Sequence, residues 1–469
     1  MSEDRNIPGE EERKSIIERY ESMIEQNESY FFDVDQFEVI IDHYMERSKL
    51  QKALDALSYA NGIYPDSTSL LLREGQIMLS SGKLSQAITK LKVLLQFEPQ
   101  NEEGLLILAS VYSQIRDHKN AIRLLNQALE FCDEEIKDDI YIDLALEHEN
   151  LGQWNKAIDV LKNALARNPE NETAIYELAY CYDETNQLET CAEYFNNFIN
   201  NYPYSFPAWY NLGNVYQRLD DIEKSISCYD FAIAINDVFT PAYLNKASAF
   251  VKNEEYHKAI ETYKEIIAFE PAHAATYCFI GECYERMELA TKATEYYNLA
   301  LETDAFFADA YIGLGMVKDL EDEIEASIAF IQKAIDLEPD QIDYYLLHSA
   351  ALKKAERYME AQRTLEKAMT LSNDNTEVWI EYADIYDKTD SAEKALLAIE
   401  HALELSSESI ALHYRKAAYL FKIGKKEAAL SLFEHLFAQD FEKCQSLLDD
   451  FPELENDPDF ILLYNEHKS

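Results

Sequence analysis

Apolar residues along this 469-residue chain recur with a helical period, in short blocks that come in pairs. From Trp209, apolar or small residues follow at three, four and seven positions beyond, as Leu212, Gly213 and Tyr216. This spacing places them on one face of a helix. A second apolar stripe follows over residues 226–233. Each pair of blocks therefore predicts a helical hairpin with an apolar face that it cannot bury alone.

The pair of blocks repeats every 34 residues, with one step of 36. We call the residue that opens each unit the anchor and number the twelve repeats in chain order. The anchors are Phe37, Leu71, Leu105, Tyr141, Ile175, Trp209, Tyr243, Tyr277, Tyr311, Tyr345, Trp379 and His413. The repeats span about residues 34 to 443, nearly the whole chain.

Small residues occupy two fixed positions in the repeat. Four residues after the anchor every repeat except the first has glycine, alanine or serine, and sixteen after it every repeat has alanine, serine or cysteine. Small side chains at fixed positions predict that two helices approach closely there. A large residue would overpack the contact, at about 1–3 kcal/mol.

Prolines mark the ends of the second helices, because proline cannot continue a helix interior. They stand at equivalent places in six repeats: Pro65, Pro99, Pro169, Pro203, Pro271 and Pro339.

The segment from Trp209 to Tyr216 reads W-x2-LG-x2-Y, and with the later small residue, aromatic residue and proline it resembles the tetratricopeptide repeat. Repeat six departs from the family pattern at Ser225 and Asp237, where alanine and proline are favoured. The resemblance implies an all-α fold, a right-handed α-solenoid superhelix of stacked antiparallel helix pairs. It also implies that the first helices line an inner groove and that the array is cooperative.

Both ends of the array are expected to be covered, since terminal repeats need polar outer faces for solubility. We predict a polar tail and a capping helix over residues 1–33, the solenoid over 34–443 and capping helices over 444–469. A C-terminal tail that folds back into the groove is the alternative. Self-association through the capped ends stays open.

The charge excludes some classes of partner. With 88 acidic and 42 basic residues the net charge is −46, which repels nucleic acid and anionic lipid. No apolar run approaches the length of a membrane span, and the N-terminus lacks a signal-peptide pattern. Seven cysteines without a CxxC pair suit a reducing compartment. The sequence predicts a cytoplasmic protein that binds neither nucleic acid nor membrane.

Catalytic and metal motifs are absent from the sequence. It contains no HExxH, no GxSxG and no glycine-rich phosphate loop, and its ten histidines are scattered. His413, at an anchor position, is interpreted as a packed helix residue. We therefore expect no enzyme activity, no cofactor and no metal site.

The groove is the remaining candidate site. By the family resemblance, residues one, five and eight positions after the anchor face inward, and in the middle of the chain these are tyrosines and amides. Such side chains offer contact area together with hydrogen-bond donors and acceptors for a peptide. Because the family commonly carries these residue types there, they also fit an ordinary repeat. The predicted partner-binding residues are Tyr176, Tyr180, Tyr210, Asn214 and Gln217 at these positions, with Asn211 and Asn245 two residues after their anchors.

Cations stand nine residues after the anchor in six of the last seven repeats, among them Arg218, Lys252 and Arg286, which complete the predicted site. Two explanations fit. A cation near the end of a first helix is stabilised by the helix dipole, by about 0.3–1 kcal/mol, or the row is a basic rail for an acidic partner.

The chaperone-binding subclass of the family uses a clamp of lysine, asparagine and arginine for a carboxylate. Here the inward positions of the first repeats carry Glu38, Asp42 and Gln76 instead. We therefore predict a non-catalytic scaffold or adaptor that binds a partner segment in the groove around repeats five to eight. The acidic inner residues Glu282, Glu285, Asp384 and Asp387 favour a neutral or basic, aromatic segment. The alternatives are a structural subunit that uses its convex or end surfaces, and a chaperone adaptor without the clamp.

Overall fold

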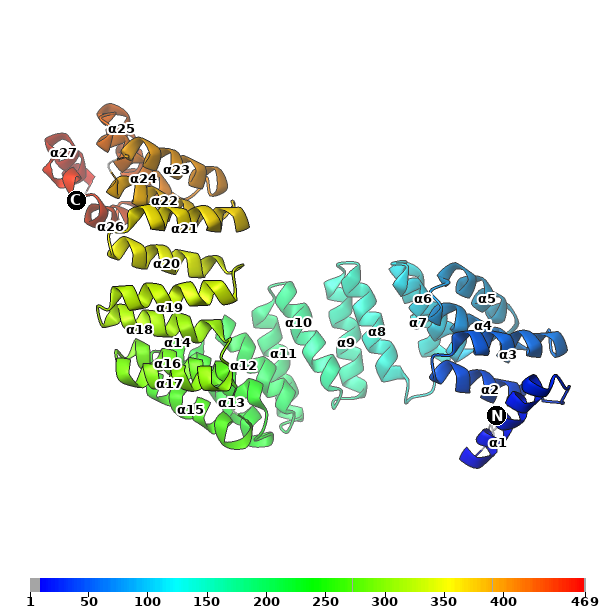
Figure 1. The fold of residues 1–469 in the computed structure, drawn as a ribbon. Helices are drawn as coiled ribbons and strands as arrows, with labels where there is room; N and C mark the ends of the chain where they lie inside the picture. The colour runs from blue at the N-terminus through cyan, green and yellow to red at the C-terminus, as the bar shows by residue number, and fades with distance from the viewer. Residues whose placement is uncertain (1–8, 272, 390, 468–469) are drawn as a thin grey trace. The chain divides into compact units, whose positions relative to one another are not determined.

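The computed structural model describes residues 9–271, 273–389 and 391–467. They form two compact units, residues 1–242 and 243–469. Within each unit, antiparallel helices follow one another in consecutive pairs (Figure 1). The predicted all-α solenoid of stacked helix pairs is confirmed. The first eight residues of the predicted N-terminal tail lie outside the described residues.

The first unit holds thirteen complete helices in its described part: α1 (Glu10–Gln26), α2 (Val34–Glu46), α3 (Leu50–Ile63), α4 (Thr68–Ser80), α5 (Leu84–Phe97), α6 (Glu102–Gln114), α7 (His118–Phe131), α8 (Lys137–Asn150), α9 (Trp154–Arg167), α10 (Glu172–Glu184), α11 (Leu188–Asn201), α12 (Phe206–Arg218) and α13 (Ile222–Ile235). From α2 onward, even-numbered helices are the first helices of the repeats and odd-numbered ones the second.

Helix α14 (Thr240–Lys252) spans the boundary between the units. The second unit continues with α15 (Tyr256–Phe269), α16 (Ala274–Arg286), α17 (Ala290–Thr303), α18 (Ala308–Leu320), α19 (Ile324–Leu337), α20 (Ile342–Lys354), α21 (Tyr358–Leu371), α22 (Thr376–Lys388), α23 (Ala392–Leu405), α24 (Ile410–Lys422), α25 (Lys426–Asp440), α26 (Lys443–Asp450), the 3₁₀ turn η1 (Pro452–Asn456) and α27 (Pro458–His467).

In the eleven hairpins where the structure describes it, the turn residue eleven positions after the anchor has the left-handed conformation. Glycine fills this place in three repeats, as Gly82, Gly152 and Gly424, with φ of 70°, 66° and 81°. Elsewhere ordinary residues adopt the same conformation, for example Asp220 with φ 62° and Glu356 with φ 60°. Because L-residues rarely adopt positive φ, its recurrence at one position shows that the 34-residue register is structural.

The prolines stand just beyond the ends of the second helices, as predicted. In all six repeats that carry one, the helix stops two residues before the proline: α3 at Ile63, α5 at Phe97, α9 at Arg167, α11 at Asn201, α15 at Phe269 and α19 at Leu337. Second helices without a following proline end at the same place, for example α13 at Ile235 and α17 at Thr303, so the proline reinforces an end that the repeat also makes without it.

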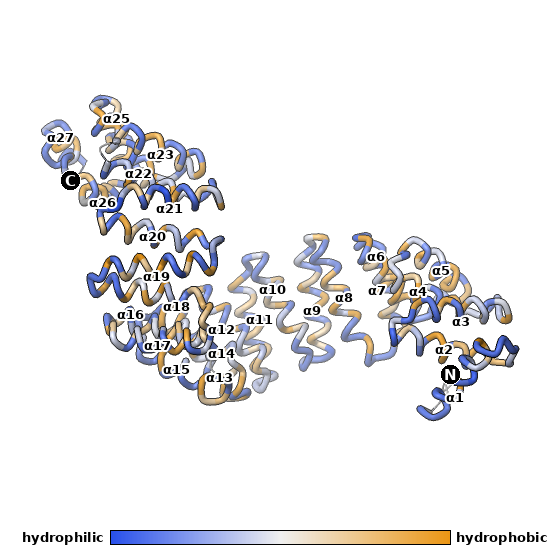
Figure 2. Tube along the Cα trace, viewed as in Figure 1, coloured by the Kyte–Doolittle hydropathy of each residue, from blue (hydrophilic) through white to orange (hydrophobic). Residues whose placement is uncertain are grey.

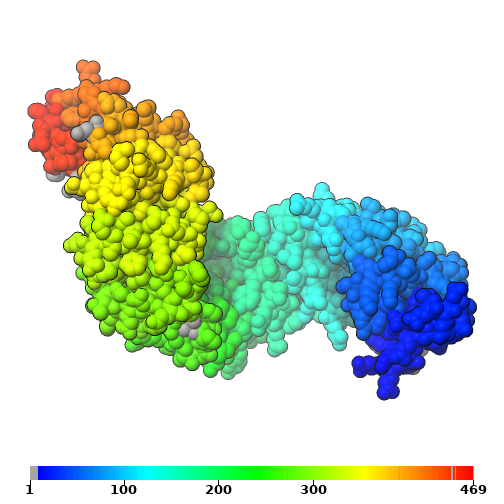
Figure 3. All heavy atoms as spheres, in the orientation of Figure 1, coloured from blue at the N-terminus to red at the C-terminus, as the bar shows by residue number. Residues whose placement is uncertain are grey.

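The glycines four residues after the anchor confirm the predicted close approach within the hairpin. A β-carbon at Gly213 would lie 2.6 Å from the Tyr229 ring, and one at Gly281 would lie 2.8 Å from the Tyr297 ring. Hydrophobic and hydrophilic residues are mixed along helices such as α19 and α21 (Figure 2), and on the face seen in Figure 3 the atoms of consecutive repeats within each unit lie against one another.

The C-terminal segment continues the repeat pattern in shortened form. Leu447 stands 34 residues after the anchor His413 and is buried on α26, which packs against α24 and α25. Phe451 and Phe460 are buried beside it. Arg415 on α24 binds Asp450, with 2.9 Å between Nη2 and Oδ2. The segment lies against the last hairpin where a thirteenth repeat would begin.

At the other end, α1 lies against the first repeat. Its buried residues Ile16, Tyr20 and Met23 join the apolar cluster that contains Phe37. None of the helices in the described part of the chain combines the length and hydropathy of a membrane-spanning segment.

Candidate functional site

A pocket of about 440 Å³ lies between α10 and α12, the first helices of repeats five and six. Six of the ten predicted site residues line it, from two helices that are consecutive along the groove. Its lining is Tyr176, Ala179, Tyr180, Asp183, Asn211, Asn214, Val215, Gln217 and Arg218.

The pocket is held in place by the packing of α12 on α13. Because Gly213 has no side chain, the ring of Tyr229 lies directly over the α12 backbone. The Tyr229 hydroxyl then lies 2.8 Å from Oδ1 of Asn214 and 2.8 Å from Oε1 of Gln217, two of the polar residues that line the pocket. The hydroxyl lies at hydrogen-bond distance from both amide oxygens, so Tyr229 links the two side chains. It orients them without lining the pocket.

Tyrosines form the wall that α10 contributes. Tyr180 is 48% exposed, and its ring lies edge-on to Trp154 with 6.0 Å between centroids. Tyr176 lies 6.4 Å from Tyr210, which in turn contacts Phe239 at 5.1 Å. Burial, with smaller effects from Glu172 and Tyr210, raises the pKa of Tyr176 to about 12. The Tyr176 hydroxyl therefore stays protonated at neutral pH and can donate a hydrogen bond.

Asn211 differs from the other predicted residues. It borders the pocket, but it is only 6% exposed and its Nδ2 donates to the carbonyl of Pro207 at 2.8 Å. Its amide thus serves the packing of its own helix.

Arg218 closes one end of the pocket in an ion pair with Asp183. The same pair recurs in the second unit: an aspartate eight residues after one anchor binds the cation nine residues after the next. Lys354 Nζ lies 2.9 Å from Asp319 Oδ1, and Lys422 Nζ lies 2.6 Å from Asp387 Oδ1. This pairing of Arg218, Lys354 and Lys422 is not among the roles predicted from sequence, although an aspartate stands 35 residues before each of these three cations. About half of each side chain in the Asp183–Arg218 pair is exposed, so the pair is worth less than about 1 kcal/mol.

Tyr210 contacts the pocket residue Tyr176 without lining the pocket itself. Asn245 and Lys252 lie on α14 and Arg286 ends α16, all in the second unit. These three residues are outside the lining of this pocket.

The second unit contains a contact like that of Tyr229, in which the tyrosine hydroxyl binds a carboxylate instead of an amide. The Tyr297 hydroxyl donates to Oε2 of Glu285 at 2.6 Å, and Glu285 stands where repeat six has Gln217. Burial raises the pKa of Glu285, against the smaller lowering effects of the Tyr297 hydrogen bond and Arg286. The half-buried carboxylate therefore carries its charge at a cost that the amide of Gln217 avoids.

Glu285→Gln is expected to stabilise the protein at neutral pH. The raised pKa means that the native state holds the Glu285 proton more tightly than the unfolded state does. The free energy of unfolding of the wild type therefore falls as the pH rises from about 4.5, the ordinary glutamate pKa, through the raised pKa of the folded protein. The variant has no such loss. Urea unfolding at pH 4 and pH 7 checks this: the gain should be present at pH 7 and nearly absent at pH 4. An equal gain at both pH values would contradict it.

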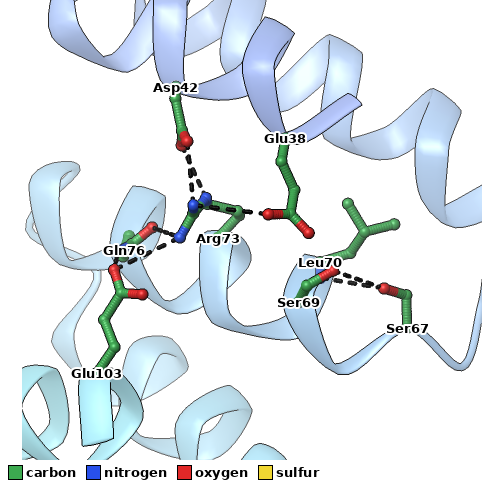
Figure 4. Close-up of polar contacts among 8 residues, drawn as sticks. All are labelled: Glu38, Asp42, Ser67, Ser69, Leu70, Arg73, Gln76 and Glu103. Carbon is green, nitrogen blue, oxygen red and sulfur yellow. Dashed lines mark hydrogen bonds and ion pairs between the residues drawn. The ribbon is translucent and has the colours of Figure 1, made fainter. Parts of the chain in front are cut away.

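The groove of the first three repeats is acidic around one arginine (Figure 4). Arg73 on α4 lies within ion-pair distance of Glu38 and Asp42 from α2 and of Glu103 from α6, at 3.8, 2.7 and 3.5 Å. Gln76 accepts a hydrogen bond from Arg73 at 3.2 Å. Three carboxylates around one cation are the reverse of a carboxylate clamp, in agreement with the sequence interpretation.

Part of the predicted acidity of the groove is compensated internally. Asp384 binds Arg415 at 2.6 Å, and Asp387 binds Lys422 at 2.6 Å. In the groove of the second unit, these two carboxylates therefore bind cations of the chain itself.

Comparison with known proteins identifies the repeats. The tetratricopeptide repeat family matches residues 103–134, 151–212, 206–237, 240–273, 274–306, 308–341 and 376–409, more than half of the chain. The chain belongs to the tetratricopeptide-repeat family. The tetratricopeptide repeat is known as a non-catalytic protein-interaction fold, and proteins of the family bind other proteins. Membership supports a protein-interaction scaffold in general terms.

Two solved structures are similar to this chain. A crystal structure of the APC/C hetero-tetramer Cut9-Hcn1 is 14% identical and covers 87% of this chain and 93% of that chain, with a TM-score of 0.39. A tetratricopeptide repeat protein from Parabacteroides merdae is 16% identical and covers 60% of this chain and 98% of that chain, with a TM-score of 0.42. A search of curated proteins finds no match to the sequence.

Proposed function

We propose that this protein is a non-catalytic scaffold that binds an extended segment of a partner protein in the pocket between α10 and α12. The observation that carries the proposal is the gathering of six predicted groove residues around one pocket. Tyrosines and linked amides offer a flat apolar contact and hydrogen-bonding groups for a peptide backbone.

The expected partner segment is neutral or basic and contains an aromatic residue. Tyr176 and Tyr180 suit stacking on an aromatic side chain, and the net charge of −46 disfavours an acidic segment. The same charge supports the absence of nucleic-acid binding. Seven free, buried cysteines support a reducing compartment, and we place the protein in the cytoplasm.

Affinity purification from native lysate tests the pocket with the variant Tyr180→Ala, Asn214→Ala. Gln217 still receives the Tyr229 hydroxyl in this variant, so the fold should be retained. We expect at least ten-fold less partner to be recovered, a loss of about 1.4 kcal/mol or more.

The matched control is Tyr204→Ala, Asn201→Ala, which removes the same residue types from exposed places in the same unit, outside the pocket. It should recover the partner as wild type does. If the pocket variant retained every partner, binding would belong to the convex or end surfaces of a structural subunit.

A further inference from the structure

A second cavity lies in the second unit, among α19, α20 and α21 of repeats nine and ten. Its volume is about 440 Å³, and its lining comes mainly from the second helices. It is therefore separate from the first-helix groove. The lining residues used below are His348, Thr364, Arg357, Arg363 and Lys367.

The cavity exists because small residues stand at its walls. Nineteen residues after the anchor, the two preceding repeats carry the aromatic residues Tyr296 and Phe330, whereas repeat ten has Thr364. Ala329 from α19 also lines the space, where repeat ten has Arg363 at the equivalent position. These short side chains leave His348 beside an unfilled volume.

His348 occupies a position where most repeats carry an apolar residue, three after the anchor. The residue is 6% exposed. Its Nδ1 lies 3.3 Å from Oγ1 of Thr364, while Nε2 has no hydrogen-bond partner among the described residues. A buried polar atom without a partner costs about 1–3 kcal/mol. If this position served packing alone, a leucine would fill it without that cost. The unpartnered Nε2 therefore indicates that His348 has a polar role.

The charge at the cavity is positive in a strongly acidic protein. Arg357 is held by Glu360 and Glu325, at 2.7 and 2.8 Å. Arg363 and Lys367 are exposed and four residues apart on α21, so they share a helix face. In the described part of the chain, neither has a carboxylate at ion-pair distance. These two cations remain to receive an anion.

We propose that this cavity binds a phosphate monoester or free phosphate, with Nε2 of His348, the guanidinium of Arg363 and the ammonium of Lys367 as hydrogen-bond donors. Three cations against two carboxylates give the lining a formal charge of +1, and protonation of His348 would make it +2. A phosphate monoester carries a charge of about −1.5 to −2 at pH 7, so the charges match when the imidazole takes up a proton.

The imidazole reports binding directly. In the free protein, burial first, then Arg357 and Lys367, lower the pKa of His348, while Glu360 and Asp336 oppose this. The ring is therefore neutral at pH 7. A bound phosphate dianion favours the protonated ring, so binding should raise the His348 pKa.

The test is carbon NMR of the full chain labelled at histidine Cε1, with His348→Gln to assign the signal. The probes are inorganic phosphate, N-acetyl-phosphoserine amide and acetate. We expect both phosphates, and not acetate, to shift the His348 signal at pH 7 and to raise its titration midpoint. If the phosphoserine compound binds more tightly than inorganic phosphate, the natural ligand is a phosphorylated protein segment. If the two bind equally, the natural ligand is free phosphate.

Arg363→Gln, Lys367→Gln should weaken phosphate binding at least ten-fold without altering the circular dichroism. The matched control is Lys119→Gln, Arg123→Gln, an exposed pair of cations at the same spacing on α7, the second helix of repeat three. The control should leave binding unchanged. An unresponsive His348 signal, an equal response to acetate, or equal losses in both double variants would overturn the proposal.

Discussion

Gly281→Leu is expected to lower the free energy of unfolding by about 2 kcal/mol, because overpacking a filled core costs up to about 3 kcal/mol. A β-carbon at Gly281 would already lie 2.8 Å from the Tyr297 ring, and leucine adds three more carbons. Tyr297 has no room to move away, since it is 0% exposed and Gly313 of the next repeat also lies against its ring. The helix propensity gained over glycine, about 0.8–1 kcal/mol, offsets only part of this cost.

The neighbouring Glu282→Leu is the control, because Glu282 is exposed on the same helix. Its stability should stay within about 0.5 kcal/mol of wild type. Urea unfolding followed by circular dichroism measures both variants. Equal effects of the two substitutions would mean that the small-residue position is not the close contact between the helices.

Phe460→Ala is expected to lower the free energy of unfolding of the second unit by about 3 kcal/mol, the cost of removing a buried phenylalanine side chain. Phe460 on α27 is 1% exposed and lies 5.0 Å from the ring of Phe433 on α25. The variant would leave a cavity between the C-terminal segment and the last hairpin.

Leu462→Ala is the matched control on the same helix. Leu462 is 63% exposed, so its loss should change stability by less than about 0.5 kcal/mol. Thermal unfolding of both variants tests the prediction that residues 444–469 cap the array. A stable Phe460→Ala protein would contradict the capping role.

The repeat register could be predicted from sequence because backbone constraints recur at fixed positions. The prolines restrict the backbone and the glycines four residues after the anchor leave space for a neighbouring helix. Both effects are steric and depend little on the surrounding residues. The left-handed turn residue is harder to predict, since glycine signals it strongly only at Gly82, Gly152 and Gly424, and asparagine or aspartate more weakly in three further repeats. The other described repeats use residues such as Glu356, whose type does not reveal the conformation.

The candidate site was only partly predictable. The spacing places Tyr176, Tyr180, Asn214 and Gln217 on the inner face, and they line one pocket. The partners that hold them were not predicted: Tyr229 comes from the second helix, and its contact depends on Gly213 leaving room. The hydrogen bond from the Asn211 side chain to the Pro207 carbonyl also depends on three-dimensional contacts, which the spacing of residues along the sequence does not reveal.

Photo-crosslinking from the pocket tests the central claim most directly. A benzophenone amino acid replaces Tyr180, which is exposed in the pocket, or Glu193, which is exposed on the second helix α11. Irradiation in native lysate should capture a partner segment from position 180 and not from position 193. Capture from position 193 alone, or equally from both, would contradict a partner-binding site between α10 and α12.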